Sequence, residues 1–165
     1  FEAQDLNILR LIEKNNKGVV IVVNKWDLIE KDSKTHLQFE KAIREKIAPF
    51  KDIQIVFTSV HEKQRILKVF EAALQAYKNR SKRIATSKLN EKMLAAIEYF
   101  HPPVVKDKMI QIKYVTQLPA DYPMFAFFCN LPQYIRTPYK NYLENKIREY
   151  FEFTGVPITI YFRKK

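Results

Sequence analysis

Four residues with the chemistry to read a nucleobase, Asn24-Lys25-Trp26-Asp27, directly follow the apolar run Val19–Val23. Ligands of open α/β sheets bind beyond the carboxyl ends of the strands, so this tetrapeptide lies where a ligand would be read. The spacing N-K-x-D suits guanine, because the Asp27 carboxylate can accept hydrogen bonds from both the ring N1–H and the 2-amino group. Adenine lacks both donors and would leave a buried carboxylate without hydrogen-bond partners, at a cost of about 1–3 kcal/mol. Asn24 can bond the far edge of the base, and the Lys25 stem can lie over the ring.

A second polar segment, Thr58-Ser59-Val60, follows the next apolar run, Ile53–Phe57. A backbone N–H at Ser59 or Val60 is expected to donate to the guanine O6. Two loops that each follow a strand, with a helix between them, form a specific arrangement for a base site. The alternative interpretation is a pair of ordinary turns between strands and helices.

The glycine count excludes several phosphate-binding motifs. The chain has two glycines, Gly18 and Gly155. A P-loop needs two glycines five residues apart, a dinucleotide fingerprint needs three, and a KH clamp needs a GxxG pair. None of these motifs occurs in these 165 residues, so we assign no catalytic residue.

Hydrophobic periodicity predicts an α-β-α-β-α order for residues 1–80, with helices over 5–16, 34–48 and about 62–78 and strands over 19–23 and 53–57. Helix-length crossovers between strands indicate a parallel α/β sheet, and the strand 19–23 is expected to be buried on both faces. Ser33 is the expected N-cap of the second helix. The third helix is expected to face inward with its larger apolar residues, Ile66, Leu67, Val69, Phe70, Ala73 and Leu74.

A basic stretch, residues 79–83, is the expected linker to a second domain over residues 81–165. Patterns there predict α-β-β-α-β: a helix that has Ser87 as its N-cap and runs to Phe100, strands over 109–117 and 124–129, a helix over 138–152, and a strand over 156–163. This order predicts a small α+β domain, a three-stranded sheet with helices on one face. The net charge of +11 divides into +4 for residues 1–80 and +7 for residues 81–165, which favours a polyanionic partner such as RNA. A solvated basic surface without a partner is the alternative.

Other candidate residues have plainer interpretations. His61 is expected to be a surface loop residue, and Cys129 a core residue of a strand. No His, Cys, Asp and Glu spacing suits a metal site. Most aromatic residues of the second half are expected to form its core, although sheet-face aromatics can stack RNA bases. No apolar run approaches the length of a membrane span, and a single cysteine fits a cytoplasmic protein.

The string VVIVVNKWDLIEK resembles the last GTPase domain of the Der (EngA) family of bacterial tandem GTPases. The resemblance continues through Phe57-Thr-Ser-Val60, through Ser87-Lys-Leu-Asn90, which is similar to the family's entry into a KH-like domain, and through Phe153-Thr-Gly-Val-Pro-Ile158. It spans essentially the whole chain. It implies the C-terminal part of a P-loop-GTPase-type domain over residues 1–80 and a KH-like domain over residues 81–165.

The resemblance further implies a GTP- or GDP-binding protein of large-subunit ribosome biogenesis, with the ribosomal subunit or its rRNA and the remaining GTPase domains as partners. In that family the P-loop, the switch threonine, the DxxG motif and the Mg²⁺ ligands belong to an earlier part of the domain. Because the chain opens at Phe1 within an apparent helix, we expect a fragment that is inactive alone. The alternative function is a standalone RNA- or protein-binding module with a degenerate nucleotide fold.

Overall fold

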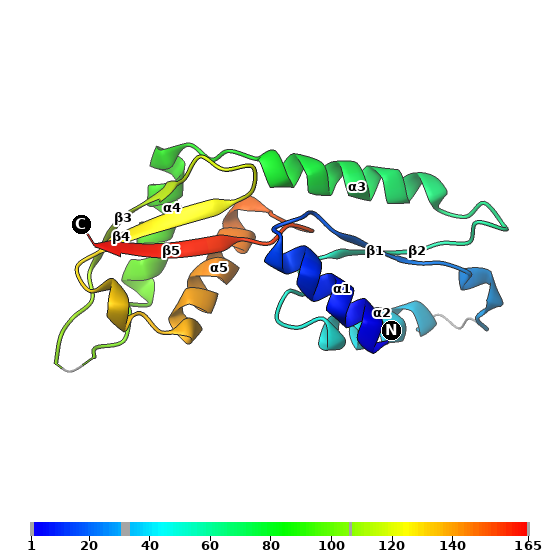
Figure 1. Cartoon of the computed structure of the whole chain (residues 1–165), viewed down its shortest axis with the longest axis horizontal. Coiled ribbons are helices and arrows are strands. Elements are labelled where there is room, and N and C mark those ends of the chain that lie inside the picture. Colours follow the sequence, from blue (N-terminus) through cyan, green and yellow to red (C-terminus); the bar gives the residue numbers. More distant parts are fainter. Residues whose placement is uncertain (1, 31–33, 106, 165) are drawn as a thin grey trace. The chain divides into compact units, whose positions relative to one another are not determined.

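The computed structural model describes residues 2–30, 34–105 and 107–164. The chain divides into two compact units, Phe1–Arg80 with Thr154–Pro157, and Ser81–Phe153 with Ile158–Lys165 (Figure 1). Four residues late in the sequence thus belong to the first unit, which a single boundary near residue 80 does not anticipate. The expected N-cap Ser33 and the basic residues Lys106 and Lys165 lie outside the described residues.

The first unit has the predicted α-β-α-β-α order, interrupted by one short 3-10 helix. Its elements are α1 (Ala3–Lys14), β1 (Val20–Val23), η1 (Trp26–Leu28), α2 (Thr35–Lys46), β2 (Gln54–Phe57) and α3 (Ile66–Ser81). Strands β1 and β2 are parallel, in a register that runs from Val20 opposite Gln54 to Val23 opposite Phe57. The α/β fold class is therefore confirmed. The shared carboxyl edge of the two strands places the loops after Val23 and after Phe57 side by side.

A small core holds this unit together. Leu9, Ile43, Ile47, Phe50 and Ile53 are buried against one another, and the partly buried β1 residues Val19, Ile21 and Val23 pack on them. The prediction that β1 is buried on both faces is wrong, because Val22 is 44% exposed. Within the described residues β1 and β2 form a sheet of two strands, and Val22 lies on the face opposite the core that Ile21 and Val23 contact.

The inward face of α3 differs from the prediction. Leu67, Phe70 and Leu74 are exposed, whereas Ala72, Ala76 and Asn79 are buried. The larger apolar residues were expected inside because they recur at helical spacing. The small residues are buried instead because the chain comes close to the helix there: a Cβ placed on Gly18 or on Gly155 would lie 3.6 or 3.2 Å from the Ala76 Cβ. An alanine face allows that close approach of backbone, and larger side chains would prevent it.

The returning segment Thr154–Pro157 is fixed to the first unit by backbone hydrogen bonds. The Val19 N–H donates to the Gly155 carbonyl at 2.8 Å, and the Gly155 N–H donates to the Asp52 carbonyl at 2.7 Å. The buried Asn79 side chain donates to the Thr154 carbonyl at 2.8 Å. Gly155 has φ +78°, a conformation that glycine adopts without steric cost.

The second unit has the predicted α-β-β-α-β order, with a further 3-10 turn. Its elements are α4 (Thr86–Tyr99), β3 (Ile112–Gln117), β4 (Met124–Cys129), η2 (Pro132–Tyr134), α5 (Thr137–Phe151) and β5 (Thr159–Lys164). The sheet order is β3-β4-β5, antiparallel between β3 and β4 and parallel between β4 and β5. Its first helix has Ala85, not Ser87, just before it, without a side-chain cap.

Both helices of this unit cover the same face of the sheet. One core cluster contains Leu89 and Met93 of α4, Leu143 and Ile147 of α5, and inward residues from all three strands, among them Val115, Phe127 and Ile160. The Asn90 side chain joins α4 to β3 by donating to the Val115 carbonyl at 2.8 Å and accepting from the Val115 N–H at 2.9 Å. The opposite face of the sheet carries none of these core residues. No described helix is long and apolar enough to cross a membrane.

Candidate nucleobase site

A pocket of about 310 Å³ lies at the carboxyl ends of β1 and β2, lined by Asn24, Lys25, Asp27, Leu28, Val60 and His61. Four of the five residues predicted to read a base, Asn24, Lys25, Asp27 and Val60, are thus brought together. The fifth, Ser59, does not line the pocket. The two loops meet here because the parallel pairing ends both strands at the same level.

Backbone hydrogen bonds join the two loops beyond the strands. The Thr58 N–H donates to the Val23 carbonyl at 2.8 Å, and the Trp26 N–H donates to the Thr58 carbonyl at 2.9 Å. These bonds continue the ladder of β1 and β2 by one step. The N-K-x-D segment is therefore held against the second loop by main-chain atoms before any side chain contributes.

The Asn24 side chain connects the same two loops. Its Oδ1 accepts from the Val60 N–H at 3.3 Å and from the Thr58 hydroxyl at 3.5 Å. The Val60 N–H is one of the two backbone donors expected to read the guanine O6, and it donates to Asn24 instead. A base that enters the pocket must share or displace this long hydrogen bond.

Trp26, the residue at the variable position of the motif, anchors the loop to the core. Its side chain is 5% exposed and packs on Phe57 with ring centroids 4.4 Å apart, and on Phe39 at 5.3 Å. Lys25 precedes it with φ +59°, so the chain turns sharply between Asn24 and the short helix η1. This left-handed turn lets Trp26 be buried while Lys25 and Asp27 line the pocket.

Ser59 holds the second loop closed by accepting two hydrogen bonds from within that loop. It is fully buried, its hydroxyl accepts from the Glu62 N–H at 3.0 Å, and its carbonyl accepts from the Gln64 N–H at 2.8 Å. The loop 59–64 therefore closes on itself and projects Val60, which is 61% exposed, toward the pocket.

His61 and Leu28 line the pocket although the sequence analysis did not assign them to it. The Leu28 side chain is 73% exposed and follows the N-K-x-D motif directly. Exposed apolar side chains at the mouth of a polar pocket are suited to contact the face of a flat ring. The sequence signal for His61 was its position next to Val60, which leaves its direction undetermined.

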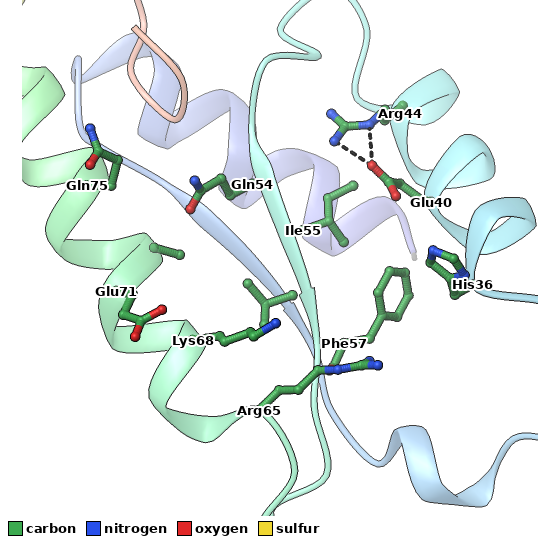
Figure 2. Close-up of a pocket in the computed structure, with 12 residues that line it drawn as sticks. His36, Glu40, Arg44, Gln54, Ile55, Phe57, Arg65, Lys68, Glu71 and Gln75 are labelled. Atoms are coloured by element: carbon green, nitrogen blue, oxygen red, sulfur yellow. Dashed lines mark hydrogen bonds and ion pairs between the residues drawn. The ribbon is translucent and has the colours of Figure 1, made fainter. Parts of the chain in front are cut away.

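A larger hollow of about 740 Å³ lies along β2 between α2 and α3 (Figure 2). Arg44 binds Glu40 there at 2.7 Å and also donates to the Lys51 and Ile53 carbonyls. Arg65 donates to the Phe57 carbonyl at 3.5 Å. These arginines satisfy backbone acceptors in the segment just before β2 and at its last residue. The hollow contains no residue predicted from the sequence to bind a base.

The described residues contain no cluster of three His, Cys, Asp or Glu side chains placed to hold a metal ion. Cys129 is buried in β4, and burial raises the pKa of its thiol. A raised pKa lowers the thiolate fraction and makes this cysteine a poor nucleophile at neutral pH.

Comparison with protein families identifies the second unit of the chain. Residues 83–163 match the family model described as the KH-domain-like C-terminal domain of EngA bacterial GTPase enzymes. The second unit is thus a KH-like domain of a class found at the end of bacterial GTPases.

Similarity along the whole of this chain identifies the family. The chain is 55% identical over 165 residues to the GTPase Der of Flavobacterium johnsoniae, and 57% identical over 166 residues to that of Bacteroides fragilis strain ATCC 25285. These matches cover 100% and 99% of this chain and 38% of each relative. The chain belongs to the Der (EngA) family and corresponds to its C-terminal part; it spans well under half the length of these relatives.

Proposed function

We propose that this chain supplies the base-reading half of a GTP-binding site and a KH-like ribosome-docking domain to a GTPase of large-subunit ribosome biogenesis. The observation that supports this most directly is the pocket in which Asn24, Lys25, Asp27 and Val60 converge from two loops. The names of the relatives, which are GTPases, point the same way.

Guanine fits the pocket by its pattern of donors and acceptors. The Asp27 carboxylate offers two acceptors to the N1–H and 2-amino donors, which only guanine among the common bases presents together. The Val60 N–H provides a donor for O6 once its bond to Asn24 is shared. Lys25 and Leu28 flank the space where the ring would lie.

Phosphate binding is expected to come from outside these residues. The chain has two glycines that are far apart, so it contains no P-loop, and the described residues contain no cluster of three His, Cys, Asp or Glu placed to hold a metal ion. Since phosphate contacts supply much of the affinity for a nucleotide, we expect these 165 residues alone to bind GTP or GDP feebly and to hydrolyse no GTP.

The KH-like domain is the proposed docking element. It lacks the GxxG clamp, so it cannot hold RNA by close approach of bare backbone. Exposed cations are available instead for phosphate contact, among them Lys88, Lys108, Lys113, Arg163 and Lys164. A large ribosomal subunit, or its rRNA, is the proposed partner in the cytoplasm, together with the other GTPase domains of the protein.

Titration of the labelled chain with GDP, ADP and XDP, followed by ¹H–¹⁵N NMR, tests the base site. GDP is expected to shift the amides of Asn24, Val60 and His61, and ADP is expected to leave them in place. Asp27→Asn replaces an acceptor by a donor, so the variant should respond to XDP in preference to GDP. Equal responses to GDP and ADP in the wild-type chain would refute the base assignment.

Co-sedimentation with purified large ribosomal subunits over a salt series tests the docking role. We expect saturable binding that weakens steeply as salt rises. Absence of binding at low salt would mean that the basic surface of the KH-like domain serves other GTPase domains instead. The standalone-module alternative predicts RNA or protein binding together with no guanine-dependent NMR shifts.

A further inference from the structure

The outer face of the β3-β4-β5 sheet, opposite the helices, carries aromatic and basic side chains in register. Tyr114 of β3 lies opposite Phe128 of β4, which lies opposite Arg163 of β5. Two residues along, Thr116 lies opposite Ala126, which lies opposite Tyr161. Alternation along each strand places these six residues on one face, because their neighbours Val115, Phe127 and Phe162 belong to the core.

The aromatic residues of this face are partly or largely accessible, and two of them pack on each other. Tyr114 and Phe128 are stacked, with ring centroids 4.4 Å apart and planes within 10° of parallel. Tyr161 is 46% exposed, whereas Ala126 beside it is fully buried, so the larger neighbours make up the accessible surface. A core role explains Phe127 and Phe125 but does not explain aromatic residues on the face away from both helices.

Charge indicates what this face would bind. The strands β3, β4 and β5 contain no acidic residue, and on this face they carry Arg163, which is exposed. Within the described part of the chain, Arg163 forms no ion pair with a carboxylate. An aromatic surface beside an unneutralised cation is suited to a chain that has both flat rings and negative charges. Single-stranded RNA combines the two, whereas a duplex hides the faces of its bases.

We propose that this outer sheet face binds single-stranded RNA, with bases stacked on Tyr161 and on the Tyr114–Phe128 pair and with Arg163 contacting phosphate. The inference rests on the proposed RNA-docking role of the KH-like domain and gives that role a site. It also explains how a KH-like domain without a GxxG clamp can hold unpaired nucleotides. The rows of Phe128 and Tyr161 are two residues apart along the sheet, about 6.6 Å, so we expect about two stacked bases.

Fluorescence anisotropy tests this with a labelled RNA of about ten nucleotides, used single-stranded and again as a duplex with its complement. The chain is expected to prefer the single strand. Tyr161→Ala should weaken single-strand binding about tenfold and leave duplex binding unchanged, and Tyr161→Phe should retain the wild-type affinity. Tyr99→Ala is the matched control, because Tyr99 is 90% exposed but lies at the end of α4. Arg163→Gln should weaken binding to both RNAs and reduce its salt dependence.

Circular dichroism establishes that each variant is folded, which is expected because Tyr161, Tyr99 and Arg163 are exposed. Equal affinity of wild type and Tyr161→Ala for the single strand would overturn the proposal, as would equal wild-type binding to single strand and duplex. Either result would leave charge-driven ribosome docking intact. Loss of all binding, to both RNAs and to large subunits, would refute the docking function itself. If Tyr161→Ala instead abolished self-association, the face would be a protein interface and the proposal would be wrong.

Discussion

Asn24 accepts a hydrogen bond of 3.3 Å from the backbone N–H of Val60, a residue 36 positions later in the sequence. This bond joins the two loops that were each assigned to base reading for a different reason. Asn24 also accepts from the Thr58 hydroxyl. The side chain therefore orients the second loop before a base is bound.

Asn24→Ala removes an acceptor shared by two donors, the Val60 N–H and the Thr58 hydroxyl. We expect the free energy of unfolding of the first unit to fall by about 1–2 kcal/mol and the GDP-dependent NMR shifts to disappear. Trp26 is the single tryptophan and lies in the adjoining turn, so its fluorescence in urea reports on this unit. Asn145→Ala, at an exposed position of α5, is the control. A wild-type response to GDP in Asn24→Ala would show that the loops are positioned without this side chain.

Trp26→Ala should destabilise the first unit more than any change in the pocket itself. It removes a buried ring that contacts Phe57 and Phe39, and such truncations cost about 3–5 kcal/mol. Trp26→Phe keeps an aromatic ring and should cost less. Thermal unfolding followed by circular dichroism measures both. If the alanine variant melted at the wild-type temperature, the packing of Trp26 would not be what holds the base-reading loop.

The two glycines form an internal pair of test and control. Gly155→Ala places a Cβ 2.9 Å from the Val19 carbonyl oxygen at φ +78°, so we expect a loss of about 1–3 kcal/mol from the first unit. Gly18→Ala meets nothing closer than 3.6 Å and should be nearly neutral. Urea denaturation followed by Trp26 fluorescence measures the stability of the first unit. The reporter Trp26 lies 129 positions before Gly155 in the sequence. Equal stability of the two variants would show that residues 154–157 are not integral to that unit.

Cys129 makes the stability of the second unit depend on alkaline pH. Burial raises the thiol pKa above its ordinary value of 9.0, so folding favours the protonated thiol. The contribution is complete below the unfolded pKa and is lost as pH rises through the folded pKa. The burial that raises the pKa of Tyr139 acts in the same direction at higher pH. Unfolding in urea between pH 8 and 10 should therefore show declining stability, and less decline in Cys129→Ala. Rapid reaction of the native thiol with a thiol reagent at pH 8 would contradict its burial.

The order of elements could be predicted because each helix and strand carries its own periodicity. The strand Met124–Cys129 was predicted at its observed limits, since an apolar run between turns determines its own length. The inward face of α3 could not be predicted in the same way. Periodicity identifies an apolar stripe, but the burial of Ala76 in place of a larger apolar residue depends on how closely Gly18 and Gly155 approach the helix.

For the candidate site too, some features could be predicted from the sequence and others depended on the tertiary structure. The sequence alone predicted a base-reading chemistry, because the hydrogen-bonding groups of Asn24 and Asp27 and their positions after a strand are local properties. The tertiary structure decided which residues share one pocket. It placed His61 and Leu28 there, turned Ser59 inward, and engaged the Val60 N–H with Asn24. These outcomes depend on contacts between segments distant in sequence, and such contacts form only when parallel strands end at the same edge.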